Sequence, residues 1–391
     1  MGNSEKIEEL RGKAVELHRN GQLAEAERLY QNILRRHSRD LEARHMLGLL
    51  RLQQGRSAEA LLMLSALAAE APGHAEIRTH HGLVLHDLGR HREALAELDQ
   101  ALAVKPGNAM TLLYRGNVLA ESGSPLAALE SYDQLLAAAP GNDEAWFRRG
   151  GVLWRLDRLD DALDSYARAL IANPHHVAAR FNGGTVLLKM ERYDEAFAAF
   201  EDVRAFVPGH PYALGGSAAA LAGSADLARW EDFRTLLLDA VGNRSSVIAP
   251  LTFLPFCDDG ALRRVCAETF AADRARVSES APGAGMRYAH ARIRLAYLSA
   301  DFHQHATAEL IAGLIERHDR TQFEVTAISF GHDDASAMRA RLMRAFDQFI
   351  DVRDKTDDGV ADLLRQGEYD IAIDLKGHTE GARPAVLARR P

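Results

Sequence analysis

The chain has 391 residues, 47% of them hydrophobic and 26% charged, which is ordinary for a globular protein of two or three domains. Its formal net charge of -8 argues against nucleic acid as the main partner, because phosphate binding requires a basic surface. The N-terminus is polar, no apolar run is long enough for a membrane span, and the two cysteines, Cys257 and Cys266, match no metal or redox spacing. We therefore expect a cytoplasmic protein that binds no membrane.

Three residue types recur along the first part of the chain at a constant interval of 34 positions. Alanine and glycine are small enough to let two helices cross closely, and a Tyr, Phe or Leu four positions after each alanine lies on the same helix face. Proline ends the second helix of each unit because it has no N–H group. The recurring residues are alanine (Ala26, Ala60, Ala94, Ala128, Ala162, Ala196), glycine (Gly48, Gly82, Gly116, Gly150, Gly184) and proline (Pro72, Pro106, Pro140, Pro174, Pro208).

This pattern resembles the tetratricopeptide repeat and predicts an α-solenoid over residues 1–242, with six clear repeats and a degenerate seventh. In the seventh repeat Ala218 replaces the glycine and Trp230 replaces the alanine, so a bulky side chain would open the helix pair. We interpret this unit as a capping or adaptor element. The resemblance implies a groove that binds proteins or peptides; a solenoid that only spaces other domains is the alternative.

The 34-residue interval is lost after residue 242. Residues 247–256 are apolar and interrupted by proline, and residues 258–274 predict one more helix. Residues 278–285 are small residues with proline and glycine, a composition typical of linkers. We therefore interpret residues 243–291 as a connecting helix followed by a linker.

Strands alternate with helices in residues 292–391, which predicts a parallel sheet covered on both faces. We expect strands over 293–299, 323–329, 348–352 and 369–375, with helices over 306–318, 336–346 and 358–366. Ligands bind at the carboxyl ends of such strands, which directs attention to the loops 300–307 and 376–383. The candidate site residues in the two loops are Asp301, His305, Thr307, Gly377, His378, Thr379 and Arg383.

The chemistry of these loops leaves some alternatives open. No dinucleotide fingerprint and no P-loop follow the strands. Asp301, His303 and His305 could hold a metal only if they converged on one side, and we expect no metal. Arg383 could bind a phosphate or could fix the preceding turn.

The motifs RLAYLSADFHQHATAEL, FEVTAISFG and IAIDLKGHTEGARP, in this order after tetratricopeptide repeats, resemble the protein O-linked N-acetylglucosamine transferases, including the bacterial SPINDLY-like members. The resemblance implies a partial, Rossmann-like lobe of a two-lobed GT-B glycosyltransferase over residues 292–391. It implies that His305 is the active-site histidine, proposed as a general base. It further implies that Gly377, His378, Thr379 and Arg383 belong to the loop near the donor sugar.

The family resemblance implies inverting transfer of N-acetylglucosamine from UDP-N-acetylglucosamine to Ser or Thr of proteins, with no cofactor beyond the nucleotide sugar. Because the chain stops at Pro391, we expect the donor-nucleotide lobe to be missing and this chain to be inactive alone. Of the asparagine ladder that lines the groove in the family, only Asn117 and Asn182 are present. The alternatives are an O-fucosyltransferase relative and a repeat scaffold whose α/β part is not catalytic.

Overall fold

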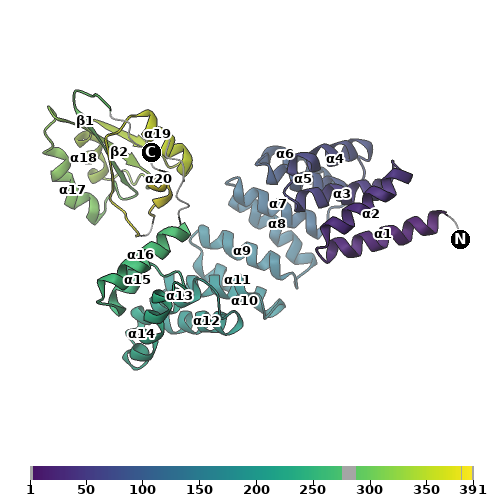
Figure 1. Cartoon of the computed structure of the whole chain (residues 1–391), viewed down its shortest axis with the longest axis horizontal. Helices are drawn as coiled ribbons and strands as arrows, with labels where there is room; N and C mark the ends of the chain where they lie inside the picture. The colour runs from purple at the N-terminus through teal and green to yellow at the C-terminus, as the bar shows by residue number, and fades with distance from the viewer. Residues whose placement is uncertain (1–2, 275–287, 380, 390–391) are drawn as a thin grey trace. The chain divides into compact units, whose positions relative to one another are not determined.

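The computed structural model describes residues 3–274, 288–379 and 381–389 (Figure 1). Contacts divide the chain into two compact units, residues 1–192 and 193–391. The boundaries that we predicted at residues 242 and 291 stay a prediction, and the linker expected at 278–285 lies outside the described residues. None of the helices in the described ranges is long and apolar enough to cross a membrane.

The first unit is a succession of antiparallel helix pairs, which confirms the predicted tetratricopeptide solenoid. Each odd-numbered helix from α1 to α9 packs on the helix that follows it. The helices are α1 (Asn3–Arg19), α2 (Leu23–Arg36), α3 (Leu41–Gln53), α4 (Ser57–Glu70), α5 (Ala75–Asp87), α6 (His91–Val104), α7 (Ala109–Glu121), α8 (Pro125–Ala138), α9 (Asp143–Arg155), α10 (Leu159–Ala172) and α11 (Val177–Lys189).

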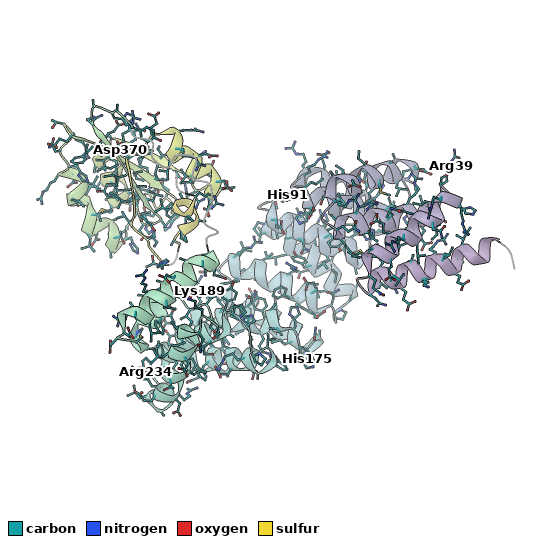
Figure 2. All side chains as sticks on the ribbon, in the orientation of Figure 1. Arg39, His91, His175, Lys189, Arg234 and Asp370 are labelled. Atoms are coloured by element: carbon teal, nitrogen blue, oxygen red, sulfur yellow. The ribbon has the colours of Figure 1, made fainter. Side chains whose placement is uncertain are left out.

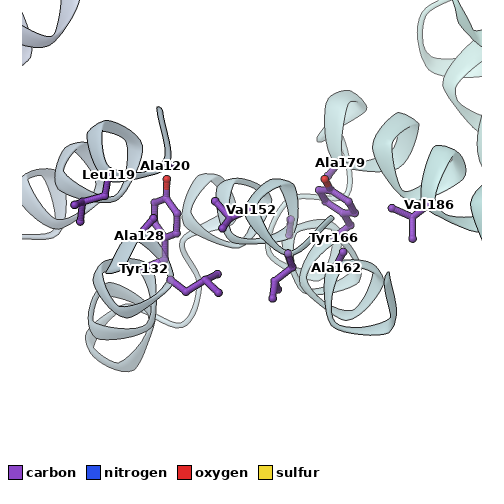
Figure 3. Packing of buried hydrophobic residues seen from close by; sticks show 12 residues of the cluster. Leu119, Ala120, Ala128, Tyr132, Val152, Ala162, Tyr166, Ala179 and Val186 are labelled. Atoms are coloured by element: carbon purple, nitrogen blue, oxygen red, sulfur yellow. The ribbon is translucent and has the colours of Figure 1, made fainter. Parts of the chain in front are cut away.

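The recurring small residues lie where the two helices of a pair touch. A Cβ atom on Gly150 would come within 2.7 Å of Cε1 of Tyr166, which is the residue four positions after Ala162. Ala128 and Ala162 have no exposed surface, and Figure 3 shows them beside the rings of Tyr132 and Tyr166. In the second to fifth repeats the side chain four positions after the alanine therefore packs directly over the glycine of its own repeat, which is why that position stays small.

A second feature with the same interval fixes where the first helix begins in five of the repeats. The residue before the helix accepts a hydrogen bond from the backbone N–H three positions later, as Asn142 does from Ala145 at 2.8 Å. Such side-chain caps satisfy N–H groups that have no partner within the helix. The capping residues are Asp40, His74, Asn108, Asn142 and His176.

The second unit begins with more helices. These are α12 (Tyr193–Phe206), α13 (Ala213–Ser224), α14 (Leu227–Gly242), α15 (Pro250–Phe253), the 3-10 helix η1 (Leu254–Phe256) and α16 (Gly260–Arg274). The ring of Trp230 stacks on Phe256, with centroids 4.2 Å apart and planes 14° from parallel. The tryptophan that replaces the expected alanine thus packs α14 against the segment that follows the repeats.

The predicted parallel sheet is present, with strand order β3-β2-β1-β4. All four strands and the first three helices of this lobe agree with the predicted ranges to within two residues at each end, whereas the short last helix was not predicted. They are β1 (Ile293–Ser299), α17 (Ala306–Glu316), β2 (Phe323–Ser329), α18 (Ala337–Ala345), β3 (Gln348–Asp351), α19 (Asp357–Gln366), β4 (Ile371–Asp374) and α20 (Pro384–Ala388).

Strand β1 is buried on both faces, because alternate side chains enter two different hydrophobic clusters. Leu295 and Tyr297 pack with residues of α17 and α18, whereas Ala296 and Leu298 pack with residues of α19 and α20. Asp370, labelled in Figure 2, extends the pairing of β1 with β4, because its carboxylate accepts the N–H of Arg294 at 2.8 Å.

Candidate functional site

The loops that follow β1 and β4 meet at a buried ion pair. Nζ of Lys376 lies 2.9 Å and 2.8 Å from the two carboxylate oxygens of Asp301. The two side chains are only 8% and 9% exposed. Because β1 and β4 are adjacent and parallel, both loops leave the same edge of the sheet. The structure therefore brings together the two loops that the sequence singled out.

Asp301 also contacts the rest of its own loop. Its backbone N–H donates to Oγ of Ser299 at 2.9 Å, and its carboxylate accepts the hydroxyl of Thr307 at 3.4 Å. Nδ1 of His305 lies 3.7 Å from the same carboxylate. Asp301, His305 and Thr307 thus form one cluster at the start of α17.

His305 is the residue that caps α17. Its Nδ1 accepts the backbone N–H of Thr307 at 3.1 Å, and its side chain is 42% exposed. The ring therefore lies at the surface of the sheet edge and is held by the helix at one nitrogen.

The second loop is shaped by the end of β4. The carboxylate of Asp374 accepts the backbone N–H groups of Lys376 and Gly377 at 2.8 Å and 3.1 Å. Gly377 has φ of +54°, which a residue with a Cβ adopts only with strain. The hydroxyl of Thr379 donates to the carbonyl of Lys376 at 2.9 Å. This tight turn presents His378 beyond the sheet edge.

His378 faces the helical segment that precedes the sheet. Its ring makes an edge contact with Phe270 at 5.6 Å, and its Nδ1 is buried without a hydrogen-bond partner among the described residues. His378 and Thr379 line a cavity of about 230 Å³ together with Phe253, Leu254 and Arg263. A second cavity of about 330 Å³ lies beside it and includes Gly377 and Phe270. Two small cavities thus adjoin the second loop.

Arg383 uses its guanidinium inside the protein. It donates to the carboxylate of Asp357 at 2.6 Å and to the carbonyl of Lys355 at 2.8 Å, and it lies over the ring of Phe330. These contacts tie Arg383 to the loop between β3 and α19, which is a different turn from the preceding one that the sequence suggested.

The loop after β2 contributes residues that the sequence reading did not select. Gly331 lies so close to the first loop that a Cβ there would overlap the carbonyl oxygen of Ala300. The carboxylate of Asp334 accepts the N–H of Gln304 at 2.8 Å, and this bond holds the pKa of Asp334 well below its ordinary value. The buried Arg339 donates to the carbonyl of Phe302 at 3.1 Å. The motif SADFHQHAT is therefore supported by the loop after β2 and by helix α18.

Lys376 is the other residue that the sequence reading missed. Lys376 follows the predicted strand 369–375, and that position by itself did not indicate a buried partner. No group of three or more His, Cys, Asp or Glu in the described ranges is placed to hold a metal ion. The ring of His303 contacts His332, with centroids 4.3 Å apart.

The repeats of the first unit carry a separate cavity of about 330 Å³. It is lined by residues of α7, α8, α9 and α11, among them Asn117, Tyr132, Phe147, Arg148 and Asn182. The hydroxyl of Tyr132 donates to Oδ1 of Asn117 at 2.7 Å. The two asparagines of the family ladder thus lie in one cavity.

The helix pairs and the parallel sheet with polar loops at its carboxyl edge define a repeat protein that also contains an α/β lobe. Residues 280–391 match the model of glycosyl transferase family 41. Residues 17–81 and three overlapping segments within 80–211 match tetratricopeptide repeat models. The chain thus combines tetratricopeptide repeats with a segment that is similar to glycosyl transferase family 41.

Curated relatives carry matching names. The probable UDP-N-acetylglucosamine–peptide N-acetylglucosaminyltransferase SEC of Arabidopsis thaliana is 31% identical over 100 residues. The UDP-N-acetylglucosamine–peptide N-acetylglucosaminyltransferase of Caenorhabditis elegans is 33% identical over 101 residues. Each match covers 26% of this chain but only 10% and 9% of the relatives, so the chain matches about a tenth of their length.

Solved structures are similar at lower identity. A mutant O-GlcNAc transferase of Thermobaculum terrenum has 23% identity and a TM-score of 0.47, over 72% of this chain and 48% of that one. The APC/C hetero-tetramer Cut9-Hcn1 has 16% identity and a TM-score of 0.51, over 56% of this chain and 44% of that one. The second likeness supports the repeat fold alone.

Proposed function

We propose that this chain is part of a protein O-glycosyltransferase that transfers N-acetylglucosamine from UDP-N-acetylglucosamine to Ser or Thr side chains of proteins. The observation that carries the proposal is the family 41 match over residues 280–391, in which the two motif loops meet through Asp301 and Lys376. The names of the curated relatives supply the donor and the transferred sugar.

In the proposed reaction the oxygen of the acceptor hydroxyl bonds to the anomeric carbon with inversion, while the bond from that carbon to UDP breaks. UDP leaves, and the proton of the hydroxyl passes to solvent. In this proposal His305 contacts the reacting groups, because its ring stands at the carboxyl edge with one nitrogen free of the helix. Gly377, His378 and Thr379 would border the donor sugar, and the cavities beside them offer space for it. Arg383 would support this loop from behind through Asp357.

The first test is the His305→Ala variant of the native protein, assayed for transfer from UDP-N-acetylglucosamine to a protein acceptor. We expect transfer to fall about a hundredfold or more, because a removed catalytic contact typically costs that much. The fold should persist, since the exposed ring carries little packing. His303→Ala in the same loop is the matched control and should keep most of the activity. Equal activity of the His305 variant and the wild type would contradict the assignment.

We further propose that the cavity in the first unit binds the protein acceptor. Its aromatic rings offer apolar contact, while Asn182 and Arg148 offer hydrogen bonds to an extended peptide. Asn182→Ala should raise KM for a protein acceptor by up to about tenfold, the effect of one lost hydrogen bond, with kcat unchanged. The exposed Asn243→Ala variant is the control. An unchanged KM in the Asn182 variant would favour the scaffold alternative for the repeats.

A further inference from the structure

The protonation pattern of His305 follows from its hydrogen bonds. Nδ1 accepts the backbone N–H of Thr307 at 3.1 Å, and a ring nitrogen that accepts cannot carry its own proton. The neutral ring must then carry its proton on Nε2.

Asp301 would favour the opposite arrangement if it were free. A carboxylate beside Nδ1 usually accepts a hydrogen bond from Nδ1–H and so favours the proton on that nitrogen. Here the carboxylate lies only 3.7 Å from Nδ1. Lys376 prevents this, because its ammonium contacts both oxygens of Asp301 within 2.9 Å in a buried position. The hydroxyl of Thr307 donates to the same carboxylate. The negative charge of Asp301 is therefore already matched.

We propose that Lys376 is a positioning residue that acts through Asp301 to hold the neutral ring of His305 in the form that carries its proton on Nε2. In this state Nε2–H can donate a hydrogen bond to a substrate oxygen, and that nitrogen cannot accept a proton. Among the described residues Nε2 has no hydrogen-bond partner, so the donor is available at the sheet edge. Only the use of this donor in catalysis rests on the proposed function; the state of the ring does not.

The test is nitrogen NMR of the chain labelled at histidine, which distinguishes a protonated from an unprotonated ring nitrogen. The His305 signals are assigned by their loss in His305→Gln. We expect the wild type to carry the proton on Nε2. Lys376→Met frees Asp301 and should move most of the population to the form protonated on Nδ1. The double variant Lys376→Met with Asp301→Asn removes the charge and should restore the proton on Nε2.

Further variants keep the test decisive. Lys355→Met removes an exposed lysine from the same lobe and should leave the His305 signals unchanged. If Lys376→Met does not fold, as judged by circular dichroism, Lys376→Gln supplies a neutral partner and should still shift part of the population to Nδ1. A wild-type ring protonated on Nδ1 would overturn the proposal. So would a folded Lys376 variant whose His305 signals match the wild type. Neither readout depends on glycosyl transfer.

Discussion

At the scale of single residues, two histidines of the repeats, His45 and His80, make the fold sensitive to acid. Nε2 of His45 and Nδ1 of His80 lie 2.7 Å apart and form a hydrogen bond between α3 and α5. Burial, and then repulsion from neighbouring histidines, lowers the pKa of each ring to about 4 from the ordinary 6.5. Both rings are thus neutral in the folded protein at neutral pH.

The sign of the pH dependence follows from these values. Between pH 6.5 and about 4 the histidines of the unfolded chain bind protons that those of the folded chain do not. The free energy of unfolding therefore keeps its full value above pH 6.5 and falls as the pH decreases below it. Each of the two histidines should lower the free energy of unfolding by up to about 1.4 kcal/mol for every pH unit in this range. We expect urea unfolding to show this loss between about pH 7 and about pH 5, and the loss should shrink when His45 and His80 are both replaced by Gln. The exposed His37→Gln variant should keep the full loss; a double variant as acid-sensitive as the wild type would contradict the assignment.

At the scale of helices, adjacent glycines of α9 meet different surroundings. A Cβ on Gly150 would lie 2.7 Å from the buried ring of Tyr166, whereas a Cβ on Gly151 would meet only the tyrosine oxygen at 3.9 Å. Gly150, the glycine that recurs in the repeats, is therefore the one that must lack a side chain, because the partner helix packs directly on it.

The pair supplies a matched test of helix packing. Both Gly150→Ala and Gly151→Ala gain helix propensity, about 1 kcal/mol, so the difference between the two variants reports the packing alone. We expect Gly150→Ala to be less stable than Gly151→Ala by about 1–3 kcal/mol, the usual cost of overpacking. Thermal unfolding followed by circular dichroism measures this difference. Equal melting temperatures would show that α9 and α10 can separate without cost.

The element ranges of the α/β lobe could be predicted from the sequence because each depends on local features. Apolar runs such as 293–299 indicate buried strands. Ser336 and Thr356 are capping residues, and each marks the start of the helix that follows it. The side-chain partners of the site could not be predicted, because Asp301 and Lys376 are separated by 75 positions and meet only through strand order. Arg383 shows the same limit, since its partners Asp357 and Lys355 lie in another turn.

At the scale of the whole molecule, the division into two units predicts that damage to one stays within it. Gly331→Ala would force the loop after β2 away from Ala300 and should loosen the sheet edge that carries Asp301 and His305. We expect faster hydrogen exchange in the segments around β1 and β2, with no change in α9 and α10. Gly313→Ala in α17 meets no atom within 4 Å and should instead stabilise the lobe slightly. Exchange that rises equally in both units would contradict this division.

The sequence by itself determined the repeat, the alternation of strands and helices, and the two loops worth examining. These features are decided by neighbours along the chain: a residue stays small because the ring 16 positions later covers it, and a helix starts because the residue before it caps it. The tertiary structure alone decided that β4 lies beside β1, since parallel strands are paired by the packing of the helices between them. That placement brings Lys376 to Asp301. The lysine looks unremarkable in the sequence, but burial makes it the partner of the Asp301 carboxylate.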